Sequence, residues 1–184
     1  MPDPTLTHPA LGPRALDVSL RPYDVKDEDT AVALWLCSWQ SAYPQIDFAQ
    51  RLDWWRDRWR NELTKSADIV IAEAGDEMIG FVTVDPRACY LDQIVVAPEH
   101  WKSGVGAALI AVAKQLSPTG LELHVNTDNA RAIRFYEKLG FSITGDGVNP
   151  ISGKPVHRMR WQPLAPNAIR CAQLPWNCSF ASRA

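Results

Sequence analysis

Two glycines stand one residue apart at the start of an apolar segment, in WKSGVGAALI (residues 101–110). We expect Gly104 and Gly106 to lie where a strand ends and a helix begins, with Lys102 and Ser103 beside them. The first turn of a helix leaves about four amide N–H groups without intrahelical partners, and glycine lets an anion approach them closely. The helix dipole, the lysine charge and the serine hydroxyl would add to the attraction. This loop is therefore predicted to bind a phosphate or a pyrophosphate.

Other interpretations of the same glycines remain open at this point. A pair of glycines also occurs where a helix packs closely against a strand and small residues are needed. A Walker A loop is disfavoured because no Gly-Lys-Ser/Thr follows the pair. A Rossmann dinucleotide site is also disfavoured, because the third glycine is missing and the strand comes in mid-chain.

A second group of polar residues follows in NTDNARAIRFYEKLGF (residues 126–141). Asn129 stands at a predicted helix start, and Tyr136 comes seven residues later. Seven residues make about two helical turns, so both side chains project from one face of the helix. The tyrosine would either belong to the core, with its hydroxyl bonded to a backbone group, or face a ligand.

The elements that would position these residues follow from hydrophobic periodicity. The expected order is a strand, two helices, three strands, a helix, a strand, a helix and two strands, which indicates a mixed α/β sheet. A tight turn at Gly75 would join the second and third strands. The expected strands cover about 17–23, 67–74, 76–85, 89–98, 121–126, 141–146 and 155–161, and the expected helices about 24–43, 47–63, 103–116 and 128–140.

Length and composition indicate one globular domain over residues 17–162, between a loose N-terminal arm (1–16) and an irregular tail (163–184). The net charge of −2 gives no electrostatic reason to expect nucleic acid or an anionic membrane as a partner. No apolar run reaches the roughly 20 residues that span a bilayer, and the N-terminus does not resemble a secretory signal. We therefore expect a cytoplasmic protein. Its four cysteines form no CxxC pair, so no metal is expected.

The two polar segments together resemble one family. PEHWKSGVGAALI is similar to the acyl-CoA pyrophosphate loop of the GCN5-related N-acetyltransferase (GNAT) superfamily, and residues 126–141 are similar to its N-x-x-A-x-x-F/Y-Y-E-x-x-G-F segment. The resemblance covers about residues 18–162, and Trp101 departs from it, because the family usually has Arg or Gln there. It implies the GNAT fold, a single α/β domain with a mixed, mostly antiparallel central sheet flanked by about four helices.

The resemblance also implies acetyl-CoA as the acyl donor and assigns cofactor contacts to matching residues. Strand residues would pair through their backbone with the pantetheine arm, loop amides would hold the pyrophosphate, and Asn129 would bond the cofactor arm. The strand residues are Ile94, Val95 and Val96, and the loop residues are Lys102, Ser103, Gly104, Val105, Gly106 and Ala107.

The implied reaction is direct transfer of the acetyl group to a primary amine of a small molecule or a peptide. An alkyl amine has a pKa near 10.4, so its deprotonation at pH 7 costs roughly 4.6 kcal/mol. A base or a dry pocket would therefore help the reaction. A strand amide near Val95 or Val96 would polarise the thioester carbonyl. Tyr136, beside the thioester sulfur, is the expected general acid for the leaving thiolate.

The base has three candidates. Many relatives carry Glu where this chain has Tyr90, so that base is absent. Asp92 follows two residues later, and His124 stands where ribosomal-protein N-terminal acetyltransferases have Glu. A water relay is the third option, because Asp92 could serve only in local hydrogen bonding and His124 only in the sheet.

The acceptor side is predicted from aromatic residues on the first two helices, which frame the acceptor site in this family. Trp39, Tyr43 and Trp54 are the candidates, and Trp54 lies off the stripe formed by Trp55 and Trp59. Tryptophans spaced four apart are more often core than ligand cage. Relatives often pair as dimers, so a homodimer is one option. A catalytically silent acyl-CoA-binding sensor or interaction module is the alternative function.

Overall fold

The structure, a computed structural model of the chain, describes residues 17–150 and 152–163. The predicted arm (1–16) and the predicted tail beyond Pro163 lie outside these residues. A seven-stranded sheet runs in the order β1-β2-β3-β4-β5-β7-β6. The strands are β1 (Ser19–Pro22), β2 (Asp68–Ala74), β3 (Glu77–Asp85), β4 (Tyr90–Val96), β5 (Leu121–Asn126), β6 (Ser142–Val148) and β7 (Pro155–Trp161).

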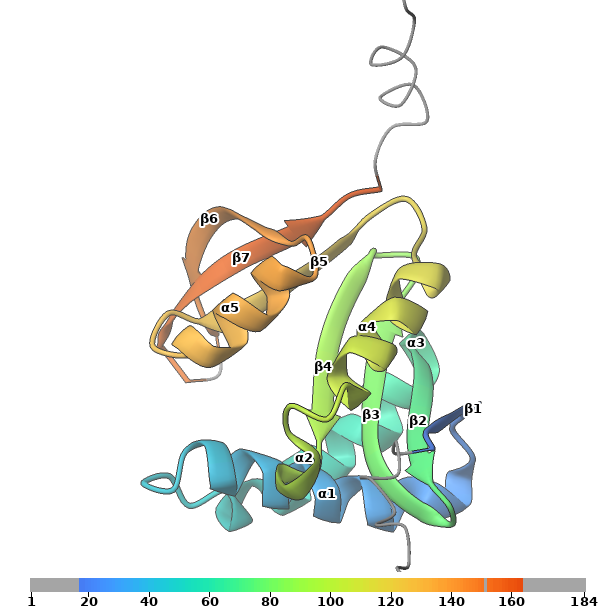
Figure 1. Cartoon of the computed structure of the whole chain (residues 1–184). Helices are drawn as coiled ribbons and strands as arrows, with labels where there is room; N and C mark the ends of the chain where they lie inside the picture. Colours follow the sequence, from blue (N-terminus) through green and yellow to red (C-terminus); the bar gives the residue numbers. More distant parts are fainter. Residues whose placement is uncertain (1–16, 151, 164–184) are drawn as a thin grey trace, which may run out of the picture.

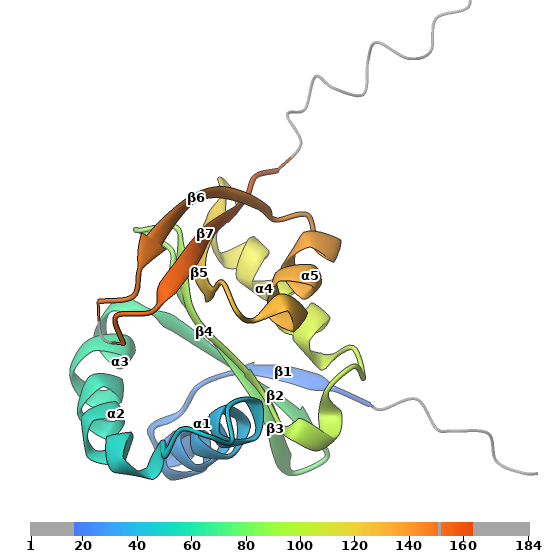
Figure 2. The same cartoon turned by 90° about the vertical axis from the view of Figure 1, so that its left-hand side faces the viewer.

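The helices cover both faces of this sheet. In Figure 2, α1 and α2 lie on one side of β2–β4, and α4 and α5 lie on the other. The long helices are α1 (Glu28–Ala42), α2 (Leu52–Arg58), α4 (Val105–Leu116) and α5 (Ala130–Lys138), and the short helical segments are η1 (Val25–Asp27), η2 (Ala49–Arg51), η3 (Trp59–Leu63), α3 (Thr64–Ser66) and η4 (Pro98–His100). Among the described residues, no helix is long and apolar enough to cross a membrane.

Pairing in the sheet is antiparallel except between β4 and β5. These two strands are parallel and share one paired position, Tyr90 with Glu122. They then diverge toward their carboxyl ends, so the sheet opens like a V (Figure 1). The mixed, mostly antiparallel sheet expected from the sequence is therefore confirmed, and the divergence adds a gap between β4 and β5.

Each face of the sheet has its own apolar core. One core joins α1 and α2 to the sheet and contains Trp35, stacked on Trp55 with ring centroids 4.6 Å apart. The other joins α4 and α5 to the sheet around Leu109 and Leu123. The predicted Trp55/Trp59 stripe is thus core, whereas Trp54 is 40% exposed.

The predicted boundaries differ from the observed ones at a few places. The predicted helix at 103–116 begins at Val105, because Lys102 (φ 69°) and Gly104 (φ 99°) adopt left-handed conformations that a helix excludes. The strand predicted at 141–146 extends as β6 to Val148, where it pairs with Pro155. The predicted helix at 47–63 runs from Ala49 to Ser66 and includes the π-helical segment η3.

A charged cluster fixes the start of α1 to the edge of the sheet. The Arg21 guanidinium on β1 donates to both oxygens of Asp27, at 2.6 and 2.8 Å, and to Glu73 on β2. Asp27 also accepts from the Asp24 backbone N–H at 2.8 Å. The Arg21 hydrogen bonds hold the pKa of the Asp27 carboxyl below its usual range.

Candidate active site

Beyond Tyr90, β4 has no paired position with β5, so the backbone groups on this side of β4 are not bonded to a neighbouring strand. The amide of Ala97 donates to Ile79 on β3 at 2.9 Å. Because backbone groups alternate in direction along a strand, the amides of Ile94 and Val96 point away from β3, toward the gap. Val95 instead buries its side chain in the core under α1. Of the three residues predicted to contact the cofactor on this strand, Ile94 and Val96 therefore point their amides away from β3.

A β-bulge interrupts β4 at Asp92. Thr83 on β3 pairs with Gln93 and Val84 pairs with Leu91, so Asp92 has no partner position. The Thr83 hydroxyl accepts from the Gln93 backbone N–H at 3.0 Å and satisfies the interrupted ladder. Bulges re-aim side chains and are common beside active sites.

The amino end of α4 lies next to the open end of this gap. Its N-cap is Gly104, and no side chain caps the helix. The amides of the first turn, from Gly104 to Ala107, therefore have no intrahelical partner and no side-chain cap. This helix end lies in the loop that the sequence predicts to bind a pyrophosphate, and such amides together with the helix dipole favour an anion.

The two glycines of this loop are required for different structural reasons. Gly104 has φ 99° with no neighbouring atom in the way of a side chain, so its backbone conformation requires glycine. At Gly106 a Cβ would lie 3.1 Å from Phe135 on α5, so glycine at this position lets α4 and α5 pack closely. Gly106 is thus explained by helix packing, the alternative that the sequence left open.

Two side chains of the loop donate hydrogen bonds to backbone carbonyls and so stabilise its conformation. The Ser103 hydroxyl donates to the His100 carbonyl at 2.7 Å. Trp101, the departure from the family pattern, donates its indole N–H to the Val96 carbonyl at 2.9 Å. The Arg131 guanidinium on α5 stacks over the Trp101 ring at 3.8 Å and adds a positive charge beside the loop. Lys102 is exposed and adds a second one.

Asn129 and Tyr136 lie on α5 and have different surroundings. Asn129 is the N-cap of the helix, and its side-chain oxygen accepts from the Ala132 N–H at 3.1 Å. That capping bond leaves the side-chain NH2 group as the donor for a ligand. Tyr136 is 7% exposed and packs edge-on against Phe135 and Phe141.

The environment of Tyr136 keeps its hydroxyl protonated. Among the described residues, this hydroxyl has no hydrogen-bond partner. Burial raises the pKa of the phenol well above its ordinary value, and the nearby Tyr90 adds to the rise. A protonated hydroxyl without a described partner can donate a proton or a hydrogen bond to a ligand that binds beside β4.

Asp92 is engaged in an ion pair. Its two oxygens accept from the Arg58 guanidinium on α2 at 2.9 and 2.5 Å, and the Gln93 side chain donates to one of them at 2.9 Å. Arg58 also lies over the rings of Trp54 and Trp55. The place beside Trp54 and Asp92 that would suit a substrate ammonium thus already holds an internal cation.

His124 faces a different partner. Its Nδ1 lies 3.1 Å from the Tyr90 hydroxyl, across the point where β4 and β5 begin to separate. The His124 side chain is exposed. Burial raises the pKa of Tyr90 to about 12, with a contribution from the Asp92 charge, so the phenol stays neutral near pH 7.

The three predicted acceptor residues are distributed over two places. Trp39 and Tyr43 stack at the end of α1, with ring centroids 6.0 Å apart. The Tyr43 hydroxyl accepts from Asn126 on β5 at 3.3 Å and contacts Asp128 at 3.5 Å, so the end of α1 reaches the end of β5. Trp54 lies apart from them on α2, beside Arg58.

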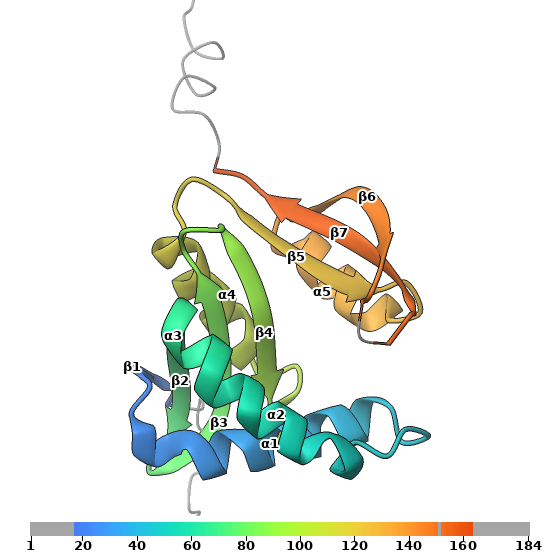
Figure 3. The same cartoon turned by 180° about the vertical axis from the view of Figure 1, so that it is seen from behind.

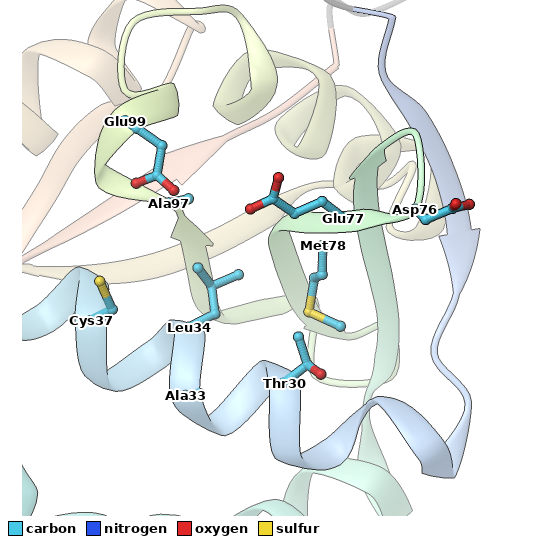
Figure 4. Close-up of a pocket in the computed structure, with 9 residues that line it drawn as sticks. All are labelled: Thr30, Ala33, Leu34, Cys37, Asp76, Glu77, Met78, Ala97 and Glu99. Carbon is cyan, nitrogen blue, oxygen red and sulfur yellow. The ribbon is translucent and has the colours of Figure 1, made fainter.

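A separate hollow of about 480 Å³ lies between α1, the β2–β3 turn and η4 (Figure 4). Its lining combines apolar side chains, such as Leu34 and Met78, with the carboxylates of Glu77 and Glu99. These carboxylates would repel the phosphates of an acyl-CoA. The hollow is therefore distinct from the predicted cofactor site. Within residues 17–150 and 152–163, no group of three or more His, Cys, Asp or Glu residues could hold a metal ion.

Comparison with known proteins identifies the family of this chain. Residues 29–141 match the Acetyltransferase (GNAT) family. The chain belongs to this family, and its class is that of N-acetyltransferase enzymes.

Two relatives of this chain are bacterial proteins named YjaB. The chain is 27% identical over 138 residues to peptidyl-lysine N-acetyltransferase YjaB of Escherichia coli, covering 75% of this chain and 91% of YjaB. It is 35% identical over 80 residues to the YjaB of Salmonella typhimurium, covering 44% of this chain and 53% of that protein. The chain thus spans about half the length of the Salmonella relative.

Solved structures give the same fold. The solution structure of apo YjaB from E. coli has a TM-score of 0.63 at 25% identity, covering 79% of this chain and 97% of that one. PaiA N-acetyltransferase from Thermoplasma acidophilum, solved in complex with coenzyme A, has a TM-score of 0.66 at 20% identity, covering 80% and 99%. Both show the GNAT fold.

Three contacts of the site were not predicted from the sequence. Arg58 is the partner of Asp92, Tyr90 is the partner of His124, and Arg131 stacks on Trp101. Arg58 follows Trp54 by four residues, a spacing that places both on one helix face and could have been noticed. The other two contacts join elements that are distant in the sequence.

Proposed function

We propose that this protein transfers the acetyl group of acetyl-CoA to the side-chain amine of a lysine in a peptide or protein. The observation that carries the proposal is the gap between β4 and β5, which has an uncapped helix at its open end and the protonated hydroxyl of Tyr136 nearby. The names of the YjaB relatives support a lysine side chain as the acceptor.

Acetyl-CoA would bind along β4. The amides from Gly104 to Ala107 would hold the pyrophosphate, whereas the Ser103 amide already donates to the His100 carbonyl at 3.3 Å. The amides of Ile94 and Val96 would pair with the pantetheine arm. The side-chain NH2 of Asn129 would donate to the same arm. Arg131 and Lys102 would supply positive charge beside the phosphates, next to Trp101, which stands where the family motif usually has Arg or Gln.

Tyr136 is proposed as the general acid. The amine nitrogen attacks the thioester carbonyl carbon, and a strand amide near Val96 stabilises the oxyanion. The carbon–sulfur bond then breaks, and the leaving thiolate takes the proton of the Tyr136 hydroxyl. Of the two protons that an ammonium loses on becoming an amide, one replaces the Tyr136 proton and the other passes to a base.

Asp92, His124 and water remain the candidates for that base. Asp92 is paired with Arg58, which occupies both of its oxygens. His124 presents an exposed imidazole.

The acceptor would approach from the side of α1 and α2. Figure 3 shows that no described helix covers β5, β7 and β6 on this side. An open face suits an extended peptide better than a closed pocket does. Trp54, Trp39 and Tyr43 border this side on α1 and α2, and a free primary amine of a small molecule could enter by the same route.

The test is acetylation of a lysine-containing peptide with a blocked N-terminus. We expect stoichiometric release of coenzyme A and a peptide heavier by one acetyl group at the lysine. A matched peptide with arginine in place of lysine should not react. A protein that binds acetyl-CoA but acetylates neither this peptide nor a panel of small amines would instead be a sensor or interaction module.

A further inference from the structure

The Tyr90–His124 contact is a side-chain pair that the proposed cofactor and acid sites do not use. Tyr90 begins β4 and His124 lies in β5, and Tyr90 belongs to the one position at which these strands pair. The hydroxyl and Nδ1 are 3.1 Å apart, and the rings are in contact with centroids separated by 5.6 Å. The pair therefore sits at the vertex of the gap into which the thioester would reach.

The contact is compatible with two arrangements of protons. If the Tyr90 hydroxyl donates to Nδ1, the imidazole proton is on Nε2 and the basic lone pair is already engaged. If Nδ1 carries the proton and donates to the Tyr90 oxygen, the lone pair of Nε2 is free. Only the second arrangement gives an imidazole that can accept a proton from an amine.

The charges around the pair distinguish His124 from Asp92. Asp92 already has a guanidinium on both oxygens, in a partly buried ion pair, so neither oxygen is free for a substrate. His124 has an uncharged phenol beside it, because burial raises the Tyr90 pKa to about 12. Three charged groups act on Tyr90: Arg58 on α2, Asp92 on β4 and Glu122 on β5. On the neighbouring strand β7, Arg158 pairs with His124 and Arg160 pairs with Glu122.

Resting on the proposed acetyl transfer, we propose that Tyr90 is a positioning residue that holds His124 with Nδ1 protonated and Nε2 free, so that His124 is the base. The Nε2 lone pair takes one proton from the substrate ammonium and later releases it to solvent. Nδ1–H keeps its bond to the Tyr90 oxygen throughout, and that bond stabilises the imidazolium. The amide, free coenzyme A and one proton are the products.

The test is a double-mutant cycle on kcat with a saturating lysine peptide. General-base catalysis is worth about 100-fold or more, so His124→Gln should lower kcat by about 100-fold. Tyr90→Phe should lower kcat by about 10-fold, with little change in the KM for acetyl-CoA. If Tyr90 acts through His124, the double variant should be no slower than His124→Gln alone. Tyr23→Phe, which removes a hydroxyl bonded to Trp59 in the core, is the matched control and should leave kcat unchanged.

Two further measurements exclude a merely structural role. The acidic limb of the kcat profile reports protonation of the base, so its position should differ between the wild type and Tyr90→Phe. The imidazole ¹⁵N shifts of His124 should show the Nδ1-protonated form in the wild type, and this form should be lost in Tyr90→Phe.

The outcomes separate this inference from the proposed function. Effects that multiply in the double variant, an unmoved pH limb, or an Nε2-protonated imidazole would overturn the role of Tyr90 while acetyl transfer stands. A wild-type protein that acetylates no amine would overturn the proposed function and this role together.

Discussion

A phenol that protonates a leaving thiolate must keep its proton until the carbon–sulfur bond breaks. Tyr136 meets this requirement because burial raises its pKa and no described side chain accepts from its hydroxyl. The Tyr136 hydroxyl therefore stays protonated at pH values up to and above the ordinary pKa of tyrosine. A loss of activity between pH 7 and 9 should not come from this residue.

Tyr136→Phe tests this role. Removal of the hydroxyl should lower kcat by about 10- to 100-fold, because general-acid catalysis typically contributes at least that much. The ring stays packed against Phe135 and Phe141, so the Kd for acetyl-CoA should change less than about two-fold. Steady-state kinetics and calorimetric titration of the same preparation give both numbers. Full activity in this variant would remove Tyr136 as the acid.

Gly104 links backbone conformation to cofactor affinity. Alanine at φ 99° is strained, so Gly104→Ala should reshape the loop and weaken acetyl-CoA binding about 5- to 10-fold, or roughly 1 kcal/mol. Gly75→Ala is the matched control, because Gly75 also has a positive φ of 62° and open space but lies in the β2–β3 turn. Equal affinity in both variants would contradict an anion site at this helix end.

At the scale of elements, the cluster of Arg21, Asp27 and Glu73 joins β1, the start of α1 and β2. Asp27→Asn should lower the free energy of unfolding by about 2 kcal/mol at neutral pH, because the change removes a charge that faces a guanidinium. The control is Asp57→Asn on the exposed face of α2, which should cost almost nothing.

The pH dependence of this difference follows from the Asp27 pKa. The folded-state value lies below the ordinary 3.8, so the stabilisation is fully present above that value. It is lost as the pH falls through the lower, folded-state value. Urea unfolding should therefore give free energies of unfolding for the wild type and Asp27→Asn that converge as the pH falls from 7 to 2. A constant difference between them would contradict this account.

Local sequence patterns predicted most of the elements but not their irregularities. The apolar spacing of 103–116 and 128–140 led to α4 and α5, and Gly75 led to the β2–β3 turn. The bulge at Asp92 and the π-helical segment η3 were not predicted. A bulge depends on the register with a partner strand, and a π turn depends on how Trp59 packs, so neither leaves a periodic signal.

The candidate site could be predicted where backbone geometry defines it. The loop at Gly104 and the face shared by Asn129 and Tyr136 follow from local spacing. The partners of the charged residues did not follow, because Arg58 with Asp92 and Tyr90 with His124 join segments 34 residues apart in both cases. Such pairs depend on tertiary contacts that one sequence does not reveal.

At the scale of the whole molecule, the proposed function depends on the division of the sheet into β1–β4 and β5–β7. The helix after β4 presents free amides, and the helix after β5 presents Asn129 and Tyr136. Because the strands are parallel and diverge, both helix ends lie at the same open side of the gap (Figure 1). A ligand that spans the gap would contact both halves, so acetyl-CoA should raise the melting temperature.

The most direct test of the central claim is a crystal structure of the protein with acetyl-CoA. We predict the pyrophosphate on the amides from Gly104 to Ala107, the pantetheine arm along Ile94 and Val96, and the thioester sulfur within hydrogen-bond distance of the Tyr136 hydroxyl. Acetyl-CoA bound elsewhere, or a thioester that lies away from Tyr136, would contradict the account.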